Sequence, residues 1–325
     1  MIDDVLGIPD QLRDALWRVE GARLQPAEAA GVLVCGMGGS GIGADLAAAA
    51  LGSRLRRPLI TVRGYELPAW ASSEWTVLCS SYSGSTEETL SCFAAAERLG
   101  ARRIVASTGG PLVEAAREAG VPVIGLPGIF QPRAAVAYML VVAAEIAALV
   151  GAAPSPRAEV EAAADFLAGE TAGLRERAAA IAAELEGSVP IVHGAGLTVP
   201  VARRWKTQLN ENAKLPAFFS ELPEADHNEI CGWAAERSRE FAGLFLEDAD
   251  QHPRERRRFE LTAAAVRDAG AAAVRVETRG DSRLARLAWA TMLGDLVSLE
   301  LADRTGVDPV AIEPIERLKE AMGEP

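Results

Sequence analysis

The sequence predicts an α/β protein of two doubly wound domains, each with a parallel sheet between two layers of helices. Two observations in the first half predict this class. Short apolar runs, which are typical of strands buried on both faces, alternate with segments of helical periodicity. Such alternation of strands and helices favours a parallel sheet. The apolar runs lie at residues 31–35, 59–62, 76–79, 103–106 and 121–126, and helical segments lie at 42–51, 86–99 and 112–119.

The second half repeats this pattern with weaker strand signals. Its strand candidates are residues 189–193, 243–246 and 272–276, and its helical segments lie around 254–269 and 315–322. A proline-containing stretch at 151–156 separates the two halves. We therefore expect a first domain at residues 1–152 and a second at 153–325, with the short, charged C-terminal helix docked on one of them.

The composition is that of a soluble globular protein, with 49% hydrophobic and 24% charged residues. A net charge of −12 argues against nucleic acids and anionic membranes as main partners. Glu145 interrupts the apolar run 134–150, which favours a buried core helix over a membrane span. The acidic first residues lack the basic region and cleavage site of a secretory signal, so we expect a cytoplasmic protein.

The cysteines indicate neither disulfides nor a metal site. Cys35, Cys79, Cys92 and Cys231 form no CxxC pair, and no histidine lies at the spacing of metal ligands. Free cysteine is among the residue types most often buried in cytosolic proteins. We therefore expect four buried free thiols and no bound metal.

The first of two unusual loops is GMGGSG, residues 36–41, which follows a predicted strand and includes Gly39 and Ser40. Glycines allow backbone N–H groups to approach an anion closely at the N-terminus of the next helix. The loop also matches the dinucleotide fingerprint GxGxxG. That fingerprint expects an acidic residue after the second strand, where this chain has Arg63. An arginine could accommodate NADP, so this loop alone leaves a dinucleotide open.

The second loop, SSYSGSTEETL at residues 80–90, favours a phosphate monoester. It presents a cluster of hydroxyl groups before a predicted helix, including those of Ser81, Ser83 and Thr86. Ser85 and Glu88 have the spacing of a capping box, but a cap would use only one hydroxyl. A phosphate accepts several hydrogen bonds at once, so we predict a phosphate site that contains Gly39, Ser40, Ser81, Ser83 and Thr86.

The two motifs GMGGSGIGADL and SSYSGSTEETL together resemble those of a sugar isomerase (SIS) domain. The segment NENAKLPAFFSELPEADHNEI resembles the bifunctional phosphoglucose/phosphomannose isomerases, which consist of two such Rossmann-like domains, and the resemblance continues at GDLVSLELADRTGVDPVAIEPIERLK. The resemblance implies a cofactor-independent isomerase. Its substrates would be glucose 6-phosphate and mannose 6-phosphate, which it would interconvert with fructose 6-phosphate by ring opening and proton transfer through a cis-enediol.

Glu211 and His227 match the family residues that move protons. Isomerisation needs a carboxylate near C2 of the sugar and an acid/base group for ring opening. The resemblance assigns the first role to Glu211 and the second to His227, which would come from the neighbouring subunit of a homodimer. Without the resemblance, Glu211 would be expected to be a solvated helix residue. Of the other histidines, His193 is expected to be a satisfied core or strand-end residue and His252 a solvated residue.

Lys319 and Arg133 complete the predicted catalytic set. Lys319 matches a lysine that assists ring opening at the ring oxygen; otherwise it is a surface charge on a helix. Arg133 follows the fifth strand, so it is placed at the carboxyl edge of the sheet, where open α/β folds bind ligands. It matches an arginine that stabilises the enediolate, with a structural salt bridge as the alternative. Residues 310–314 contain no threonine where the family has one, so glucose 6-phosphate is the better supported substrate.

Three other functions can be tested against this one. A non-catalytic sugar-phosphate sensor would use the same loops without turnover. An NADP-linked oxidoreductase would use the glycine loop. An amidotransferase-type isomerase domain is disfavoured, because we find no N-terminal cysteine or glutaminase domain in this chain.

Overall fold

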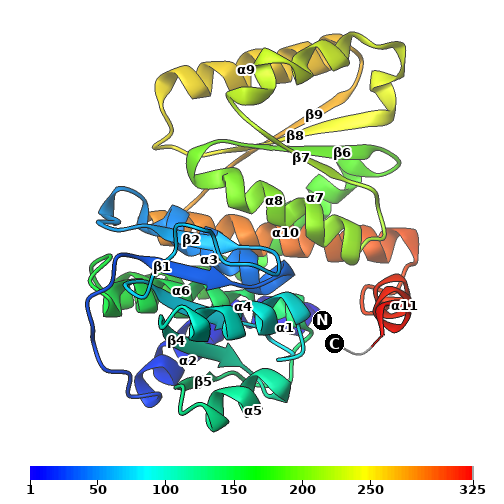
Figure 1. Cartoon of the computed structure of the whole chain (residues 1–325). Coiled ribbons are helices and arrows are strands. Elements are labelled where there is room, and N and C mark those ends of the chain that lie inside the picture. Colours follow the sequence, from blue (N-terminus) through cyan, green and yellow to red (C-terminus); the bar gives the residue numbers. More distant parts are fainter. Residues whose placement is uncertain (324–325) are drawn as a thin grey trace. The chain divides into compact units, whose positions relative to one another are not determined.

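The computed structural model describes residues 1–323, which divide into two compact units. One unit is Leu6–Phe166, and the other comprises Met1–Val5 and Leu167–Pro325. The chain passes from the first to the second within the long helix α7 (Arg157–Leu185) (Figure 1). The boundary expected between residues 152 and 153 falls just before this helix.

The first unit contains a parallel sheet in the order β2-β1-β3-β4-β5, within residues 32–125. Each strand overlaps an apolar run of the sequence, which confirms the predicted class. Helices α4 and α5 pack on the sheet through a core that contains Cys35, Cys79 and Phe93. Helix α6 contacts both α2 and α3, and all three helices also contact strands of the sheet. The strands are β1 (Val32–Cys35), β2 (Leu59–Val62), β3 (Thr76–Ser80), β4 (Arg102–Ser107) and β5 (Val123–Gly125); the helices are α2 (Ile8–Gly21), α3 (Gly38–Leu51), α4 (Glu87–Arg98), α5 (Gly110–Glu118) and α6 (Val136–Leu149).

The apolar segment around α6 is a core helix, as predicted. Pro132–Leu149 is long and apolar enough to span a membrane, but 78% of it is buried inside the protein. It packs against α3 and α2. It is the single segment of this kind within residues 1–323.

The second unit contains a parallel sheet in the order β7-β6-β8-β9, within residues 189–277. Three strands follow the prediction, whereas the short strand β7 was not predicted. Helices α8 and α10 pack together beside β6, while α9 covers β8 and β9 through a core around Phe245 and Phe259. The elements are β6 (Val189–Gly194), β7 (Phe218–Glu221), β8 (Phe241–Glu247), β9 (Ala272–Glu277), α8 (Val199–Glu211), α9 (Pro253–Asp268), α10 (Arg283–Thr305), the terminal helices α1 (Ile2–Leu6) and α11 (Glu313–Met322), and short 3₁₀ turns η4 (Glu224–His227), η5 (Glu229–Ala234) and η6 (Glu236–Glu240).

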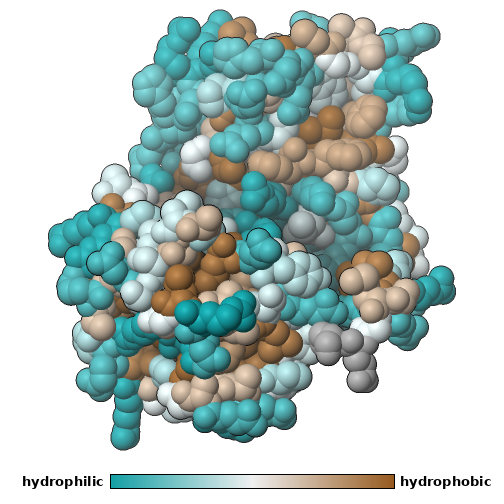
Figure 2. Space-filling view, viewed as in Figure 1, coloured by the Kyte–Doolittle hydropathy of each residue, from teal (hydrophilic) through white to brown (hydrophobic). Residues whose placement is uncertain are grey.

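The structure bears on two further expectations. No residue of α11, whose ten residues are all described, is buried, and the start of this helix lines a pocket together with α8. Apolar side chains are visible in Figure 2 at the place that α11 occupies in Figure 1. Cys35, Cys79 and Cys92 are buried free thiols as predicted, but Cys231 is exposed because the turns of η5 leave it at the surface.

Candidate active site

The glycine-rich and serine-rich loops meet at the switch point of the first sheet. The chain leaves β1 toward β2 on one side and returns to β3 on the other, so β1 and β3 are neighbours whose connections diverge. Such a point at the carboxyl edge is where open α/β sheets bind ligands. A Cβ atom on Gly36, directly after β1, would lie 2.8 Å from the carbonyl oxygen of Ser80 at the end of β3. The two loops are therefore in contact.

The glycine-rich loop folds into the first turn of α3 instead of preceding it. The expected start at residue 42 is wrong, because the helix begins at Gly38, whose φ of +50° favours glycine. No side chain of the described chain caps this N-terminus. Ser40 is buried within the first turn. The amides of Ser40 and Gly41 donate to the carbonyl oxygen of Met37, the N-cap residue. The amides of Gly38 and Gly39, which precede them in the first turn, are the ones that can donate to an anion.

The serine-rich loop is ordered by hydrogen bonds among its own hydroxyl groups. The Oγ of Ser81 lies 2.8 Å from the Oγ1 of Thr86 and accepts a hydrogen bond from the amide of Gly84 at 3.0 Å. The Oγ of Ser83 accepts from the hydroxyl of Ser85 at 3.0 Å. Gly84 has φ +72°, and a Cβ there would lie 1.8 Å from the carbonyl oxygen of Gly109. Only glycine fits this turn.

The capping alternative for these hydroxyls is wrong. The N-cap of α4 is Thr86, and within residues 1–323 no side chain forms a cap hydrogen bond there. The Oγ of Ser80 points instead toward the core, where it lies 3.2 Å from the sulfur of Met139. Two helix N-termini without side-chain caps, those of α3 and α4, thus lie beside hydroxyl groups at one switch point, and both dipoles favour a negative charge there.

Arg133 adjoins the glycine-rich loop. It lies in a 3₁₀ turn (Pro132–Ala135) and is 4% exposed. A Cβ on Gly39 would be 3.6 Å from the Cα of Arg133, which is an ordinary contact. The structure therefore brings Gly39, Ser40 and Arg133 together in the first unit, near the loop that carries Ser81, Ser83 and Thr86.

Glu211 is the last residue of α8 in the second unit. Its carbonyl oxygen accepts a hydrogen bond from the Nζ of Lys214 at 2.6 Å. The flanking amides anchor the helix end: Asn210 donates to the carbonyl oxygen of Leu215, and Asn212 donates to the hydroxyl of Ser298 on α10. Glu211 remains half-buried.

A pocket of about 340 Å³ adjoins this carboxylate. Thr207 and Asn210 line it from α8, and Ile312 and Ile315 line it from the start of α11. The pocket thus presents an apolar wall beside Glu211.

The structure does not bring His227 or Lys319 into the lining of the Glu211 pocket. His227 ends η4 and is exposed, and Lys319 is exposed on α11, one turn beyond Ile315. His252 accepts a hydrogen bond from the amide of Arg254 and caps α9, so it is exposed as expected but also structural.

His193 is a core residue, as predicted, but within residues 1–323 its ring nitrogens are not hydrogen-bonded as that prediction requires. It is 1% exposed and stacks on Phe245 with a centroid distance of 4.6 Å, but neither ring nitrogen has a hydrogen-bond partner in the described part of the chain. Burial lowers the pKa of His193 to about 4, so the ring is neutral near pH 7. It lies beside a pocket of about 220 Å³ that Glu229 and Trp233 also line.

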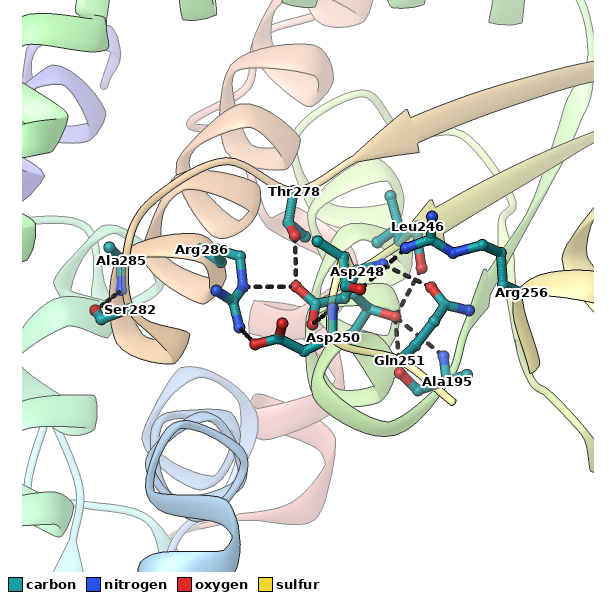
Figure 3. Close-up of polar contacts among 12 residues, drawn as sticks. Ala195, Leu246, Asp248, Asp250, Gln251, Arg256, Thr278, Ser282, Ala285 and Arg286 are labelled. Atoms are coloured by element: carbon teal, nitrogen blue, oxygen red, sulfur yellow. Dashed lines mark hydrogen bonds and ion pairs between the residues drawn. The ribbon is translucent and has the colours of Figure 1, made fainter. Parts of the chain in front are cut away.

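The corresponding corner of the second sheet is filled by carboxylates. Asp248, after β8, is 2% exposed. It accepts a hydrogen bond from the hydroxyl of Thr278 at 2.6 Å and forms an ion pair with Arg286 at 2.8 Å (Figure 3). Arg286 also pairs with Asp250, and Gln251 accepts from the amide of Asp248. Arg286 is therefore already engaged by the two carboxylates of this corner. Sequence patterns did not indicate this network, because its members are distant along the chain.

Folds of this architecture occur in phosphosugar isomerases with SIS domains. The chain is similar to the solved structure of tagatose-6-phosphate ketose/aldose isomerase from Escherichia coli, with a TM-score of 0.74 and 15% identity over 95% of this chain and 93% of that chain. This likeness shows the fold and confirms the predicted SIS architecture. A family model described as bacterial phospho-glucose isomerase C-terminal SIS domain matches residues 174–322.

Curated relatives define the family more narrowly. The chain is 37% identical to the bifunctional phosphoglucose/phosphomannose isomerase of Aquifex aeolicus (strain VF5), over 90% of each chain. It is 33% identical to the protein of that name from Caldicellulosiruptor bescii, over 100% of this chain and 99% of the relative. The chain belongs to the family of bifunctional phosphoglucose/phosphomannose isomerases. It is therefore an isomerase, an intramolecular oxidoreductase, and these relatives support that prediction over the sensor alternative.

Proposed function

We propose that the chain interconverts glucose 6-phosphate, and also mannose 6-phosphate, with fructose 6-phosphate. The observation that carries this proposal is the pair of helix N-termini without side-chain caps, which lie beside clustered hydroxyl groups at the switch point of the first sheet. A phosphate monoester is an anion that accepts several hydrogen bonds at once, so it suits this corner. The names of the relatives support both aldose substrates.

The phosphate is held by groups of the first unit. Backbone amides of the first turns of α3 and α4 donate to it, and hydroxyl groups complete the cradle. The residues that we assign to it are Gly39, Ser40, Ser81, Ser83 and Thr86. Ser80 is not among them, because its hydroxyl faces Met139.

Ring opening comes first. A base takes the proton of the anomeric hydroxyl while an acid gives a proton to the ring oxygen, which frees the C1 aldehyde. We assign the acid/base role to His227 of the partner subunit and place the Lys319 ammonium at the ring oxygen. Both side chains are exposed, so they can exchange protons with solvent between turnovers.

Proton transfer at carbon follows. Glu211 removes the proton from C2 of the open aldose, which gives a cis-enediolate with its charge on O1. A proton then passes from the O2 hydroxyl to O1, and Glu211 returns its own proton to C1. The Arg133 guanidinium stabilises the negative charge that develops on the enediolate oxygens. C2 is oxidised to a ketone as C1 is reduced to an alcohol within the same molecule. The reaction therefore needs no external oxidant or reductant, and hence no redox cofactor.

We also propose that the protein is a cytoplasmic homodimer. Two observations support a second copy: His227 is exposed on η4, and α11 exposes the apolar side chains of Ile315, Leu318 and Met322, which are 40%, 64% and 63% exposed. Spaced three and four residues apart, these side chains form one stripe along the helix. Light scattering coupled to gel filtration should give twice the chain mass; a monomeric mass at assay concentration with full activity would contradict the role of His227 across the interface.

Activity is tested with three sugar phosphates. A dehydrogenase-coupled assay should detect turnover of fructose 6-phosphate to glucose 6-phosphate, and mannose 6-phosphate should be consumed with a lower kcat/KM. We expect glucose 6-phosphate to be preferred because residues 310–314 lack the threonine expected from the resemblance. Binding of fructose 6-phosphate without turnover of any of the three sugars would instead identify a sensor.

A further inference from the structure

The tripeptide Arg63-Gly64-Tyr65, directly after β2, contacts both helices that carry the phosphate loops. On the α3 side, the Nη2 of Arg63 pairs with Asp45, whose other oxygen accepts a hydrogen bond from Thr61 at 2.5 Å. The Nε of Arg63 lies 3.2 Å from the position that a Cβ of Gly41 would occupy. Arg63 therefore lies along the first turns of α3.

On the other side, the tripeptide is bound to the first turns of α4. The hydroxyl of Tyr65 donates to the Oε2 of Glu87 at 3.0 Å, and Glu87 is the first residue of that helix. The Oγ of Ser91 donates to the carbonyl oxygen of Tyr65 at 2.7 Å, and the thiol of Cys92 donates to that of Gly64 at 3.4 Å. The tripeptide is thus joined to α4 by three hydrogen bonds and to α3 by the Arg63–Asp45 ion pair.

The charges of these contacts bear on phosphate binding. Glu87 is the first residue of α4, and Asp45 is the eighth residue of α3, so it lies about two turns from the start of its helix. An uncompensated carboxylate on either helix would weaken the attraction of an anion to the helix N-termini. Arg63 compensates Asp45, and Tyr65 directs its hydroxyl hydrogen at Glu87. The hydrogen bond to Glu87 raises the pKa of Tyr65 above its ordinary value. Neutralising these two carboxylates matters more in a chain whose net charge of −12 already repels an anionic substrate.

We propose that Arg63 and Tyr65 are positioning residues of the phosphate site: they fix the N-termini of α3 and α4 relative to each other and compensate one carboxylate on each helix. Neither residue needs to touch the substrate. This inference rests on the proposed function, because it takes the loops on these helices to be the phosphate site.

The test uses the full-length protein, with glucose 6-phosphate as substrate and inorganic phosphate as a competitive inhibitor. Arg63→Gln should raise both KM and the inhibition constant of phosphate by roughly tenfold, the equivalent of about 1.4 kcal/mol, with kcat within about twofold of wild type. Tyr65→Phe should change the same two constants by roughly threefold. Asp45→Asn, added to Arg63→Gln, should recover most of the lost affinity because it removes the charge that Arg63 compensates.

Matched variants separate this role from general destabilisation. Arg54→Gln breaks an arginine–carboxylate pair with Glu159, and Tyr138→Phe removes a tyrosine hydrogen bond to Asp14, both in the same unit. These two variants should leave the inhibition constant of phosphate unchanged. If wild type neither turns over glucose 6-phosphate nor binds phosphate, the proposed function fails. If wild type does both, and Arg63→Gln and Tyr65→Phe leave KM and the inhibition constant unchanged, this inference alone is overturned.

Discussion

The hydroxyl oxygens of Ser81 and Thr86 lie 2.8 Å apart at the N-terminus of α4. Ser81 is buried, and its Oγ also receives the amide proton of Gly84 at 3.0 Å. The pair is therefore held in place before any ligand arrives, which reduces the entropy lost on binding. Two preorganised oxygens at a helix N-terminus are the structural basis of the proposed phosphate site.

Removing either hydroxyl of this pair should weaken substrate binding. Ser81→Ala and Thr86→Val should each raise KM for glucose 6-phosphate by roughly 10- to 100-fold, since a hydrogen bond to a charged group contributes about 1.5–3 kcal/mol. Steady-state kinetics measure this change. Ser85→Ala serves as the control, because its hydroxyl donates to Ser83 and is not assigned to the phosphate. Equal KM values for all three variants would contradict the assignment.

The turn at Gly84 should not tolerate a side chain. Gly84→Ala meets both a φ of +72° and the carbonyl oxygen of Gly109, whereas Gly120→Ala meets a similar φ of +65° in open space. The control should lose about 1 kcal/mol of stability from backbone strain. Gly84→Ala should lose clearly more, as measured by the denaturation midpoint in urea. A smaller loss at Gly84 than at Gly120 would mean that the loop rearranges freely.

His193 should make stability depend on pH. Burial lowers its pKa to about 4 in the folded protein, against about 6.5 in the unfolded chain. The unfolded state therefore binds the extra proton first, so stability from this residue is lost as pH falls from about 6.5 toward about 4. His193→Phe keeps the stack on Phe245 and has the adjoining pocket for its larger ring.

The variant should be more stable than wild type at pH 5, because it also removes two buried nitrogens without partners in the described chain, each of which costs about 1–3 kcal/mol. Thermal unfolding between pH 4.5 and 7.5 measures the difference between the two proteins. A constant difference across this range would show that His193 titrates normally, contrary to this account.

The ion pair between Arg204 and Asp295 should be needed for the fold around Glu211. Both side chains are 1% exposed, and the guanidinium contacts the carboxylate through bonds of 2.9 and 2.6 Å that join α8 to α10. Asp295→Ala leaves a buried arginine uncompensated and should cost about 3–5 kcal/mol. Asp303→Ala, a neighbour on α10 that is exposed, is the control. Equal midpoints of urea denaturation for the two variants would contradict a structural role for the pair.

Much of the fold follows from the sequence, because parallel strands buried on both faces are continuous apolar runs. The run at 76–79 became β3 for this reason. The strand β7 ends in Ser220 and Glu221 and has a mixed burial pattern, so no continuous apolar run predicts it. The start of α3 at Gly38 was missed because glycines in a first helical turn oppose helix propensity and are kept by close contacts of the backbone.

The candidate site was predicted only in part. The density of hydroxyls indicated a phosphate loop, but only packing shows that Ser80 turns toward Met139 while Ser81 faces Thr86. The contact between Arg63 and Asp45 joins a strand end to a helix, so spacing along the chain gives no signal for it. The roles of Glu211 and His227 came from resemblance and remain proposals.

Hydrogen exchange at carbon tests the proposed role of Glu211 most directly. Wild type incubated with glucose 6-phosphate in deuterated water should incorporate deuterium at C2 of glucose 6-phosphate and at C1 of fructose 6-phosphate, as followed by proton NMR. Glu211→Gln should abolish both exchange and isomerisation while inorganic phosphate still binds, and Glu184→Gln, an exposed glutamate on α7, should match wild type. Undiminished exchange and turnover in Glu211→Gln would contradict the account.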